Sequence, residues 1–597
     1  MIQKLCSRIC SLLVLTTGRH TQGFKQQLGI SSSKRTKKDD GPLPLIAEEV
    51  KQQQTSEESQ QLFKQGKISA GKLQKLDPTS TGSSSSNNVS RDEIRRLNRL
   101  TDYPEVYEAK IDLYDETKGG RYQDVANFQC IYEVLEWAKV KNPEKDYNYL
   151  SSPLKEEREA WALRDGKQVN ATDYSGLCLW GDEAPCFNTG GSLFIFLWSL
   201  LGVIDLTRHW ICCFPKSLIC KCGCKGRHTY DSVLKVIVWM MVCALSDDPP
   251  ELRHDGIPFS QSPYKGDKAR AARYASKRKI SRCCILKKKG DWCHLKQVCG
   301  LQGWRATGAL LRMCYCCYAS WGGVNTALDA SLGASWRNAR FQSNAEYMAT
   351  LRRDAGYVSE LFNLPGFIFT MFILDLMHIA DLGITQVILG NIIFELILEM
   401  GGTIGQPDDA IVNFMNFLRL ACHALDMKPP LTGHPPLSTF KRQGKDPRFR
   451  GKAAQTRYLL NVVVWILENC LVPSNPHQQL RYDCLKFLWR FYRELENWDP
   501  AASPGRAEGY GRQHCILYIQ LSREHQHLFE RLGYHPFKYY PKHHLFVHCC
   551  EEGIALCGNP REVWAYRDES AIGDAVDVAE SCHPCYSIRN VIDKRRL

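Results

Sequence analysis

Asp375 and His378 interrupt a strongly apolar stretch of the chain, FILDLMHIAD, at residues 372–381. Burying a charge is costly unless the charge is paired or bound to a metal. If a helix begins here, the three-residue spacing places both side chains on one face, where His378 could orient Asp375 or touch a nucleic acid. A capped helix start with a satisfied histidine is the simpler alternative, and both interpretations fit the sequence.

Two further acids are candidates to join Asp375 at one site. Asp182 follows the short apolar run SGLCLWG, and Glu569 follows Tyr-Arg-Asp in a late helical segment. Two-metal phosphoryl transfer needs two or three carboxylates around divalent cations about 3.5–4 Å apart. Mg²⁺ prefers carboxylate oxygen, and strand ends are where α/β sheets form active sites. The hypothesis is therefore that Asp182, Asp375 and Glu569 bind Mg²⁺ or Mn²⁺, with His378 as a fourth catalytic residue.

Cysteines and histidines suggest a second kind of metal site. Cys314 and Cys317, together with His544 and His548 one helical turn apart, could complete a tetrahedral zinc site. A second, denser group lies at Cys213, Cys220, Cys222, Cys224 and His228, although Cys-x-Cys-x-Cys is not the usual zinc spacing. The alternative is that these cysteines are buried hydrophobic residues. The chain has 27 cysteines, an odd number, which favours a reduced intracellular protein over a disulfide framework.

The net charge of +13 is concentrated in one segment. Residues 201–320 contain 21 Lys and Arg against 8 Asp and Glu, which accounts for the whole excess. Lysine and arginine neutralise phosphates without reading sequence, and nearby aromatic rings can stack on bases. We therefore expect a DNA-contacting surface at the densest basic run, with six candidate residues: Lys277, Arg278, Lys279, Lys287, Lys288 and Lys289. A solvated charged surface is the alternative, and no helix-turn-helix or paired zinc finger indicates sequence-specific binding.

The pattern of apolar residues predicts the elements that position these side chains. Residues 175–181 form a buried strand, and residues 190–205 form either the next strand or a buried helix. Helices are expected at 230–245 and 385–400, through much of 401–540, and around Glu569 near the end of the chain. The apolar run at 192–204 is too short to span a bilayer, and the run containing Asp375 is a poor candidate, so no membrane association is expected.

Five short stretches resemble, in order and in their wide spacing, motifs of the CACTA (En/Spm-type) DNA transposases and related transposon-derived proteins. They are GDEAP at 181–185, CYCC at 314–317, DLMHIADLG at 375–383, YPKHHLFVH at 540–548 and YRDES at 566–570. The resemblance covers residues 175–585, about two thirds of the 597 residues. Two departures stand out: Glu183 replaces a glycine of the first motif, and Asp568 competes with Glu569 for the third acidic role.

The resemblance implies an α/β (α+β) fold with an RNase H-like core whose acidic triad is split by a large all-helical insertion. Carried over, the triad is Asp182, Asp375 and Glu569. The resulting organisation is a low-complexity, largely disordered tail (1–100), an N-terminal helical region (101–165), the first part of the core (166–390) with a Cys-rich basic insert at about 205–320, the helical insertion (391–540), and the final part of the core with the Glu569 helix (541–597).

The implied function is that of a DDE-type DNA transposase or a domesticated derivative, which binds DNA and cuts and joins phosphodiesters with two Mg²⁺ ions. The alternative is a catalytically inactive, Cys-rich scaffold that binds nucleic acid or protein. DNA is the expected partner, with a homo-oligomer as a further possibility. The basic run SSKRTKKDD at 32–40 favours a nuclear location, while an organellar location would follow if the N-terminus is a transit peptide.

Overall fold

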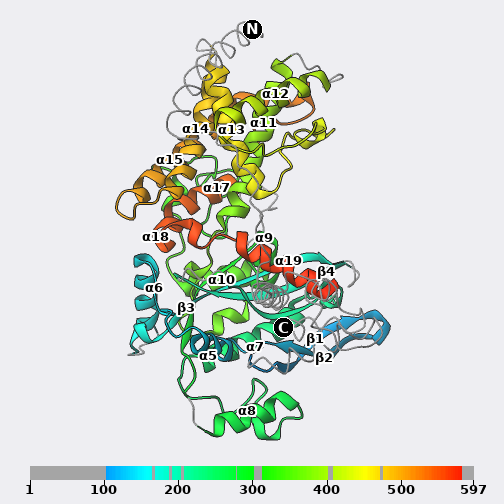
Figure 1. Ribbon diagram of the computed structural model, residues 1–597, viewed down its shortest axis with the longest axis vertical. Helices are drawn as coiled ribbons and strands as arrows, with labels where there is room; N and C mark the ends of the chain where they lie inside the picture. The colour runs from blue at the N-terminus through cyan, green and yellow to red at the C-terminus, as the bar shows by residue number, and fades with distance from the viewer. Residues whose placement is uncertain are drawn as a thin grey trace, which may run out of the picture.

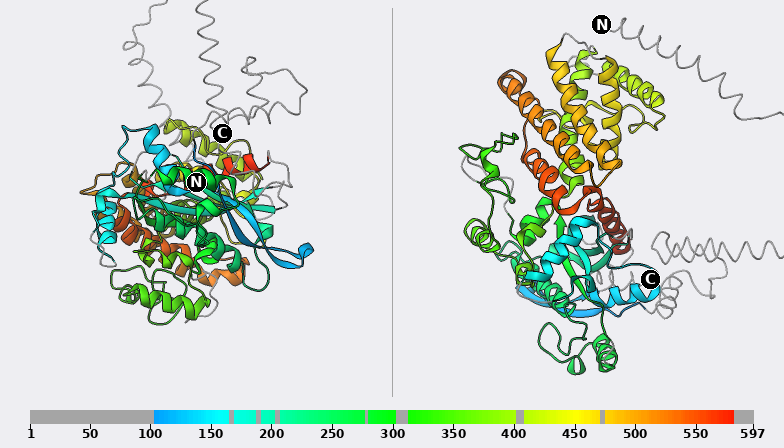
Figure 2. Two further views of the ribbon diagram at one scale, coloured as in Figure 1. Left: turned by 90° about the horizontal axis from the view of Figure 1, so that it is seen from below. Right: turned by 90° about the vertical axis from the view of Figure 1, so that its left-hand side faces the viewer.

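The computed structural model describes residues 103–164, 169–186, 191–202, 207–276, 279–301, 312–400, 408–470 and 475–580. The predicted tail at 1–100 and its targeting signals lie outside these ranges. A mixed sheet with its covering helices forms one end of the molecule, and the helices of residues 385–496 form the other (Figures 1 and 2). The helices that precede and carry Glu569 lie between the two ends.

Four strands form the central sheet: β3 (Ser175–Cys186), β4 (Gly191–Leu200), β5 (His209–Pro215) and β6 (Cys283–Gly290). Their order is β5-β4-β3-β6, with β3, β4 and β5 antiparallel and β6 parallel to β3. The predicted strand at 175–181 is present but continues to Cys186, so Asp182 lies within it. The apolar run at 192–204, which could have been a helix, contributes β4.

Helices cover both faces of this sheet because successive strand residues point to opposite sides. On β4, Phe194, Phe196 and Trp198 belong to the main core, which also contains buried residues of α7 (Arg227–Cys243). The alternate residues Leu193, Ile195 and Leu197 pack in a second cluster with buried residues of α19 (Tyr566–Glu580). Asp182 pairs with Ile195 on β4, and α19 packs across β3.

The expectation of a helical region at 101–165 is wrong in its first half. Residues there form a β-hairpin of β1 (Tyr107–Asp115) and β2 (Gly120–Phe128). Alternate residues of β1, from Tyr107 to Leu113, are fully buried, which is the period of a strand. Gly119 and Gly120 adopt positive φ at the turn, where side chains are disfavoured. Helices begin only afterwards, with α5 (Ile131–Lys141) and α6 (Ser152–Leu163).

Residues 391–540, which were predicted to form a helical insertion, are largely helical where the structure describes them. Its main helices are α11 (Thr385–Glu399), α12 (Asp408–Ala424), α13 (Ala453–Cys470), α14 (Pro476–Glu496) and α15 (Ser503–His525). A π-helix, Met377–Ile384, leads directly into α11. The combined helix Met377–Glu399 is the one described helix long and apolar enough to cross a membrane, but 83% of its most apolar window is buried inside the protein, as in a core helix.

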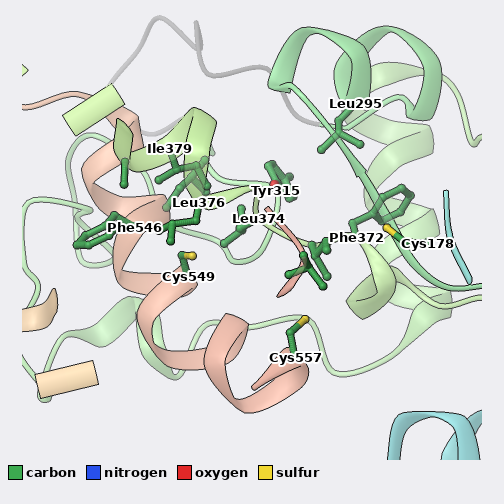
Figure 3. Packing of buried hydrophobic residues seen from close by; sticks show 14 of the residues in the cluster. Cys178, Leu295, Tyr315, Phe372, Leu374, Leu376, Ile379, Phe546, Cys549 and Cys557 are labelled. Carbon is green, nitrogen blue, oxygen red and sulfur yellow. The ribbon is translucent and has the colours of Figure 1, made fainter. Parts of the chain in front are cut away.

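The segment Phe372–Leu376 enters the core where the two ends of the molecule meet (Figure 3). It packs near Phe546 of α17 (Pro541–His548), Cys549 of the π-helix Cys549–Gly553, and Cys557 of α18 (Ile554–Cys557). An isolated parallel bridge joins Phe372 to Lys288, so this segment continues the sheet beyond β6. Apolar packing on all sides therefore fixes the backbone that carries Asp375.

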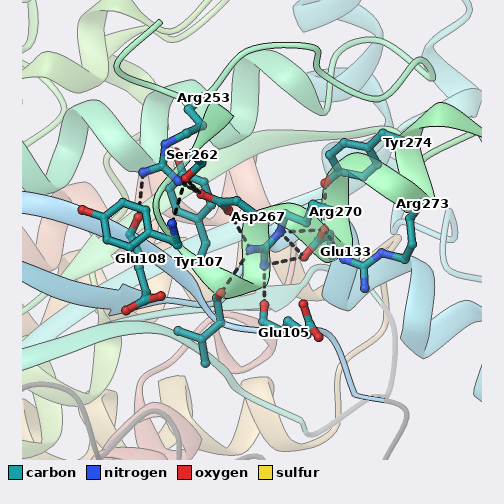
Figure 4. A network of polar contacts seen from close by, with 12 residues as sticks. Glu105, Tyr107, Glu108, Glu133, Arg253, Ser262, Asp267, Arg270, Arg273 and Tyr274 are labelled. Atoms are coloured by element: carbon teal, nitrogen blue, oxygen red, sulfur yellow. Dashed lines mark hydrogen bonds and ion pairs between the residues drawn. The ribbon is translucent and has the colours of Figure 1, made fainter. Parts of the chain in front are cut away.

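Part of the basic segment is neutralised inside the protein. Helix α8 (Lys265–Ala275) contributes Arg270, which is fully buried and bonds both oxygens of Glu133 at 2.9–3.1 Å. Arg253 and Arg270 both pair with Asp267, which is also fully buried (Figure 4). Removing one partner from such a network leaves a buried charge uncompensated, so these arginines serve the fold rather than a DNA surface.

Candidate metal centres

Asp182, His378 and Glu569 meet although they are far apart in the sequence. One potential ligand atom from each lies within 4.8 Å of the others. Asp182 comes from β3, His378 from the π-helix and Glu569 from the first turn of α19. Asp375 adjoins this group, because its Oδ2 atom lies 2.5 Å from Nδ1 of His378. The structure thus brings together all four residues that the sequence singled out as catalytic.

Asp375 differs from the other acids because protein donors already occupy both of its oxygens. Oδ1 accepts from the backbone N–H groups of Met377 and Ala565, and Oδ2 accepts from the backbone and ring of His378. Burial opposes ionisation, but the bond and charge of His378, with Lys289 nearby, hold the pKa of Asp375 below its usual value. Asp375 therefore caps the π-helix and orients His378 at the same time.

His378 presents its other ring nitrogen to the acids. Its Nε2 atom is 3.5 Å from Oε1 of Glu569. Although burial favours the neutral ring, the bond to Asp375 and the charges of Glu569 and Asp182 raise the pKa of His378 to about 9. A cation at this position, either the imidazolium itself or a metal ion, balances the surrounding carboxylates.

Asp291 is a further member of the acidic group that sequence reasoning missed. It follows β6 directly, and Gly181 of β3 pairs with Gly290 of β6, so Asp182 and Asp291 occupy neighbouring positions on parallel strands. Its side chain accepts a bond from the backbone N–H of His294 at 2.6 Å. The sequence does contain a signal for Asp291, because this aspartate follows the apolar run CCIL of a strand. The three lysines between them made the segment look like a basic surface instead.

The carboxylates of this group repel one another. The pKa of Asp182 is well above its usual value because of burial and then because of Asp291 and Glu569. Burial also raises the pKa of Glu569, against the attraction of His378. Oε1 of Glu569 makes no hydrogen bond, and the ring of His378 is its nearest cationic neighbour. Carboxylates that repel one another in this way could share a cation.

Asp568 and Glu569, the two candidates for the third acidic role, have different surroundings. Asp568 is fully buried and bonds Lys289 at 2.5 Å and Arg208 at 2.7 Å. Both of its oxygens are therefore engaged by cations of the fold. Glu569, one residue later on α19, turns toward Asp182 and shares a hydrogen bond with it.

The expectation that Lys287, Lys288 and Lys289 lie on a DNA-contacting surface is wrong. All three are on β6 and are at most 1% exposed. Lys288 bonds His294 at 2.9 Å, and Lys289 bonds Asp568, because β6 is paired with β3 and covered by packed helices. Lys279 is exposed but pairs with Asp247 and Asp248, while the remaining two candidates, Lys277 and Arg278, lie outside the described residues.

A cavity of about 270 Å³ opens beside the acids. Asp291, Asp375 and His378 line one part of it, and apolar side chains line most of the rest. Arg448 and Lys542 also line it. Lys542 donates to the backbone oxygen of His378 at 2.6 Å, and burial lowers the pKa of Lys542 to about 8.

The predicted Cys₂His₂ group also assembles. Cys314, Cys317, His544 and His548 are fully buried, and their ligand atoms lie within 4.8 Å of one another. Sγ of Cys317 is 3.3 Å from Nε2 of His544 and 3.3 Å from Nε2 of His548. The two Nε2 atoms are 3.1 Å apart. A tetrahedral zinc ion with bonds of about 2.0–2.3 Å separates its ligands by roughly 3.3–3.8 Å, so the group could hold zinc.

The surroundings of this group resemble the outer shell of a metal site. His548 directs Nδ1 to the carboxylate of Glu552, which fixes the ring with Nε2 facing the cysteines. Trp336 packs against both histidine rings at 4.6 and 5.0 Å. Burial opposes ionisation of Cys314, but hydrogen bonds from Cys316 and Cys317 hold its pKa well below the usual thiol value.

No protein-family model matches the sequence, and a search of curated proteins finds no match.

Proposed function

We propose that this protein is a DDE-type DNA transposase or a domesticated derivative, in which the mixed sheet is an RNase H-like core. The observation that carries the proposal is the convergence of Asp182, Asp291, Glu569 and His378 from four separate segments. Asp182 and Asp291 extend from adjacent parallel strands, the location expected for the active site of an α/β sheet. The helical insertion between His378 and Glu569 also agrees with the transposase resemblance.

In this proposal the metal-binding carboxylates are Asp182, Asp291 and Glu569. Asp375 takes a different role from the one expected, since its oxygens are occupied by four protein donors. It holds His378 so that Nε2 faces the acids. Two Mg²⁺ or Mn²⁺ ions held there would activate a water for cutting a phosphodiester and then the freed 3′-hydroxyl of the DNA for joining.

The remaining residues of the site position the DNA backbone and its reacting phosphate. Arg448 and Lys542 are cations on the wall of the cavity beside the acids, where they would attract a phosphate. The backbone bond from Lys542 to His378 fixes the π-helix relative to α17. Fixed ligands and a fixed phosphate are what an in-line displacement requires from the protein.

The test is nicking of supercoiled plasmid DNA by the full chain in Mg²⁺ or Mn²⁺. We expect Asp182→Asn, Asp291→Asn and Glu569→Gln each to abolish nicking and leave the fold and DNA binding intact. Glu183→Gln is the matched control, because Glu183 follows Asp182 on the same strand but pairs with Lys216 at 2.5 Å. An active Asp291→Asn variant would exclude Asp291 from the metal site.

An inactive wild type would change the conclusion. DNA binding without cleavage, unaffected by loss of all three acids, would support the Cys-rich scaffold instead. Zinc in the buried Cys₂His₂ group is compatible with either function, because a closed four-ligand site stabilises a fold and leaves no position for substrate.

A further inference from the structure

A second group of cysteines and a histidine is partly exposed and shares no residue with the acidic group or with the buried Cys₂His₂ group. Cys220, Cys222 and Cys224 precede α7, and His228 is in its first turn. Their ligand atoms lie within 4.8 Å of one another. The burial differs from that of the Cys314 group: Cys222 is exposed, and Cys224 and His228 are half-buried.

The distances within this group match a zinc ion better than a disulfide. Sγ of Cys220 is 3.3 Å from Sγ of Cys222, well beyond the roughly 2.0 Å of a sulfur–sulfur bond. Nδ1 of His228 is 3.5 Å from the first sulfur and 3.3 Å from the second. These are close to the roughly 3.3–3.8 Å that separate ligands around tetrahedral zinc.

The backbone of the turn is shaped to bring the thiols together. Gly223, Lys225 and Gly226 have φ values of +93°, +56° and +84°. Lysine in this conformation is uncommon and persists only where the surroundings enforce it. The N–H of Cys220 also donates to the hydroxyl of Thr229 at 3.0 Å, which ties the start of the turn to α7.

We propose that Cys220, Cys222, Cys224 and His228 form a second zinc site, which fixes the turn at the start of α7. The unusual Cys-x-Cys-x-Cys spacing is accommodated because the left-handed residues reverse the chain between the thiols. His228, supplied by the helix, completes the set of four ligands. The partial exposure of the thiols makes this zinc exchangeable, whereas zinc at the fully buried Cys₂His₂ group exchanges slowly.

The proposal also assigns a structural purpose to the turn. Helix α7 packs against the β1–β2 hairpin and against β6, so its start must be fixed for the sheet to be covered. Arg227, between the cysteines and His228, donates to the backbone oxygens of Ala355 and Gly356. Zinc at this point would hold that contact as well.

The test is the zinc content and release kinetics of the full chain, purified under reducing conditions with added Zn²⁺. We expect about two zinc ions per wild-type chain, one withdrawn rapidly by a chromogenic chelator and one slowly. Cys222→Ser and His228→Ala should each remove the rapid phase and leave the slow one. Cys293→Ser is the control, because Cys293 is exposed but belongs to neither group.

Two results would overturn the proposal. One is a rapid phase that persists in Cys222→Ser and in His228→Ala. The other is a wild-type chain that takes up no zinc removable by these substitutions. Cobalt substitution provides a second readout, since a tetrahedral thiolate site gives sulfur-to-cobalt absorption that the Cys222→Ser variant should weaken.

Discussion

A substitution of Asp375 can show whether this residue orients His378 or binds a metal ion itself. We expect Asp375→Asn to keep the fold, because asparagine caps a helix about as well as aspartate. It should lower Mg²⁺-dependent nicking by about 10–100-fold, the usual effect of losing a residue that orients a ligand. The amide nitrogen would face the ring of His378 and favour the wrong tautomer. The measurement is the nicking rate beside that of Asp182→Asn.

The two variants should separate clearly. Asp182→Asn removes a metal ligand and should leave no measurable activity. Full activity in Asp375→Asn would mean that Asp375 only caps the π-helix. Complete loss in a folded protein would restore Asp375 to the metal site.

Asp381 gives a pH prediction that does not involve the acidic group. It is fully buried, and burial raises its pKa to about 6, against bonds from the hydroxyls of Tyr492 and Tyr566. A raised carboxyl pKa adds stability below about pH 4, and this contribution is lost as pH rises through about 6. Asp381→Asn should therefore gain thermal stability over wild type between pH 4 and pH 7, by up to about 3 kcal/mol. Parallel melting curves against pH would contradict this.

For single residues, the sequence indicated which side chains share a site better than it indicated which groups surround them in the fold. Asp182, Asp375, His378 and Glu569 were grouped through their resemblance to transposase motifs, because residue types alone leave many acids of the chain as candidates. The lysines of β6 could not be placed correctly, since their burial depends on pairing with β3 and, for Lys289, on Asp568, which is 279 residues away in the chain. Asp291 was overlooked for the same reason: its neighbour Asp182 is adjacent only through strand pairing.

Among the helices and strands, the periodicity of apolar residues predicted the long helices correctly but not all of the strands. Helix α11 and the helices of the insertion were predicted because long apolar patterns identify helices strongly. The hairpin β1–β2 was missed because a helix-like charged run precedes it and the helical interpretation was extended through it. Strand β4 was ambiguous, since a strand buried on both faces has no alternation to detect.

Helix α11 offers a packing test with a matched control. A Cβ at Gly390 would lie 2.3–2.5 Å from backbone atoms of Arg448, so the helix and this loop could not both keep their positions. We expect Gly390→Ala to cost about 1–3 kcal/mol or more in unfolding free energy. At Gly509, on α15, nothing lies within 4 Å of the new Cβ. Gly509→Ala should be neutral or stabilise by up to about 1 kcal/mol.

The measurement is the melting temperature of each variant beside that of the wild type. A similar loss of stability in both variants would mean that the contact at Arg448 does not determine the effect of Gly390→Ala. An unchanged melting temperature for Gly390→Ala would contradict the close approach of α11 to the loop.

Across the whole molecule, α17 connects the buried Cys₂His₂ group to the acidic group. Its residues His544 and His548 belong to the Cys₂His₂ group, while Lys542 in its first turn holds the backbone of His378. The loop that carries Cys314 and Cys317 approaches the helix from a distant part of the chain. Zinc would therefore stabilise the junction at which the helical insertion returns to the sheet.

Because α17 links the two groups, we expect that loss of zinc from the Cys₂His₂ group reduces activity at the acidic group, although zinc does not contact the acids. Cys317→Ser should remove the slowly exchanging zinc, lower the melting temperature, and reduce nicking although Asp182, Asp291 and Glu569 are unchanged. Cys515→Ser is the matched control: it is also fully buried and contacts α17 through the backbone oxygen of His543, but it lies outside the cluster. Both variants bear the cost of a buried hydroxyl, so a difference in zinc content and nicking isolates the metal. Equal zinc content in the two variants would show that the four residues are a buried hydrogen-bonded group, and that α17 is positioned by packing alone.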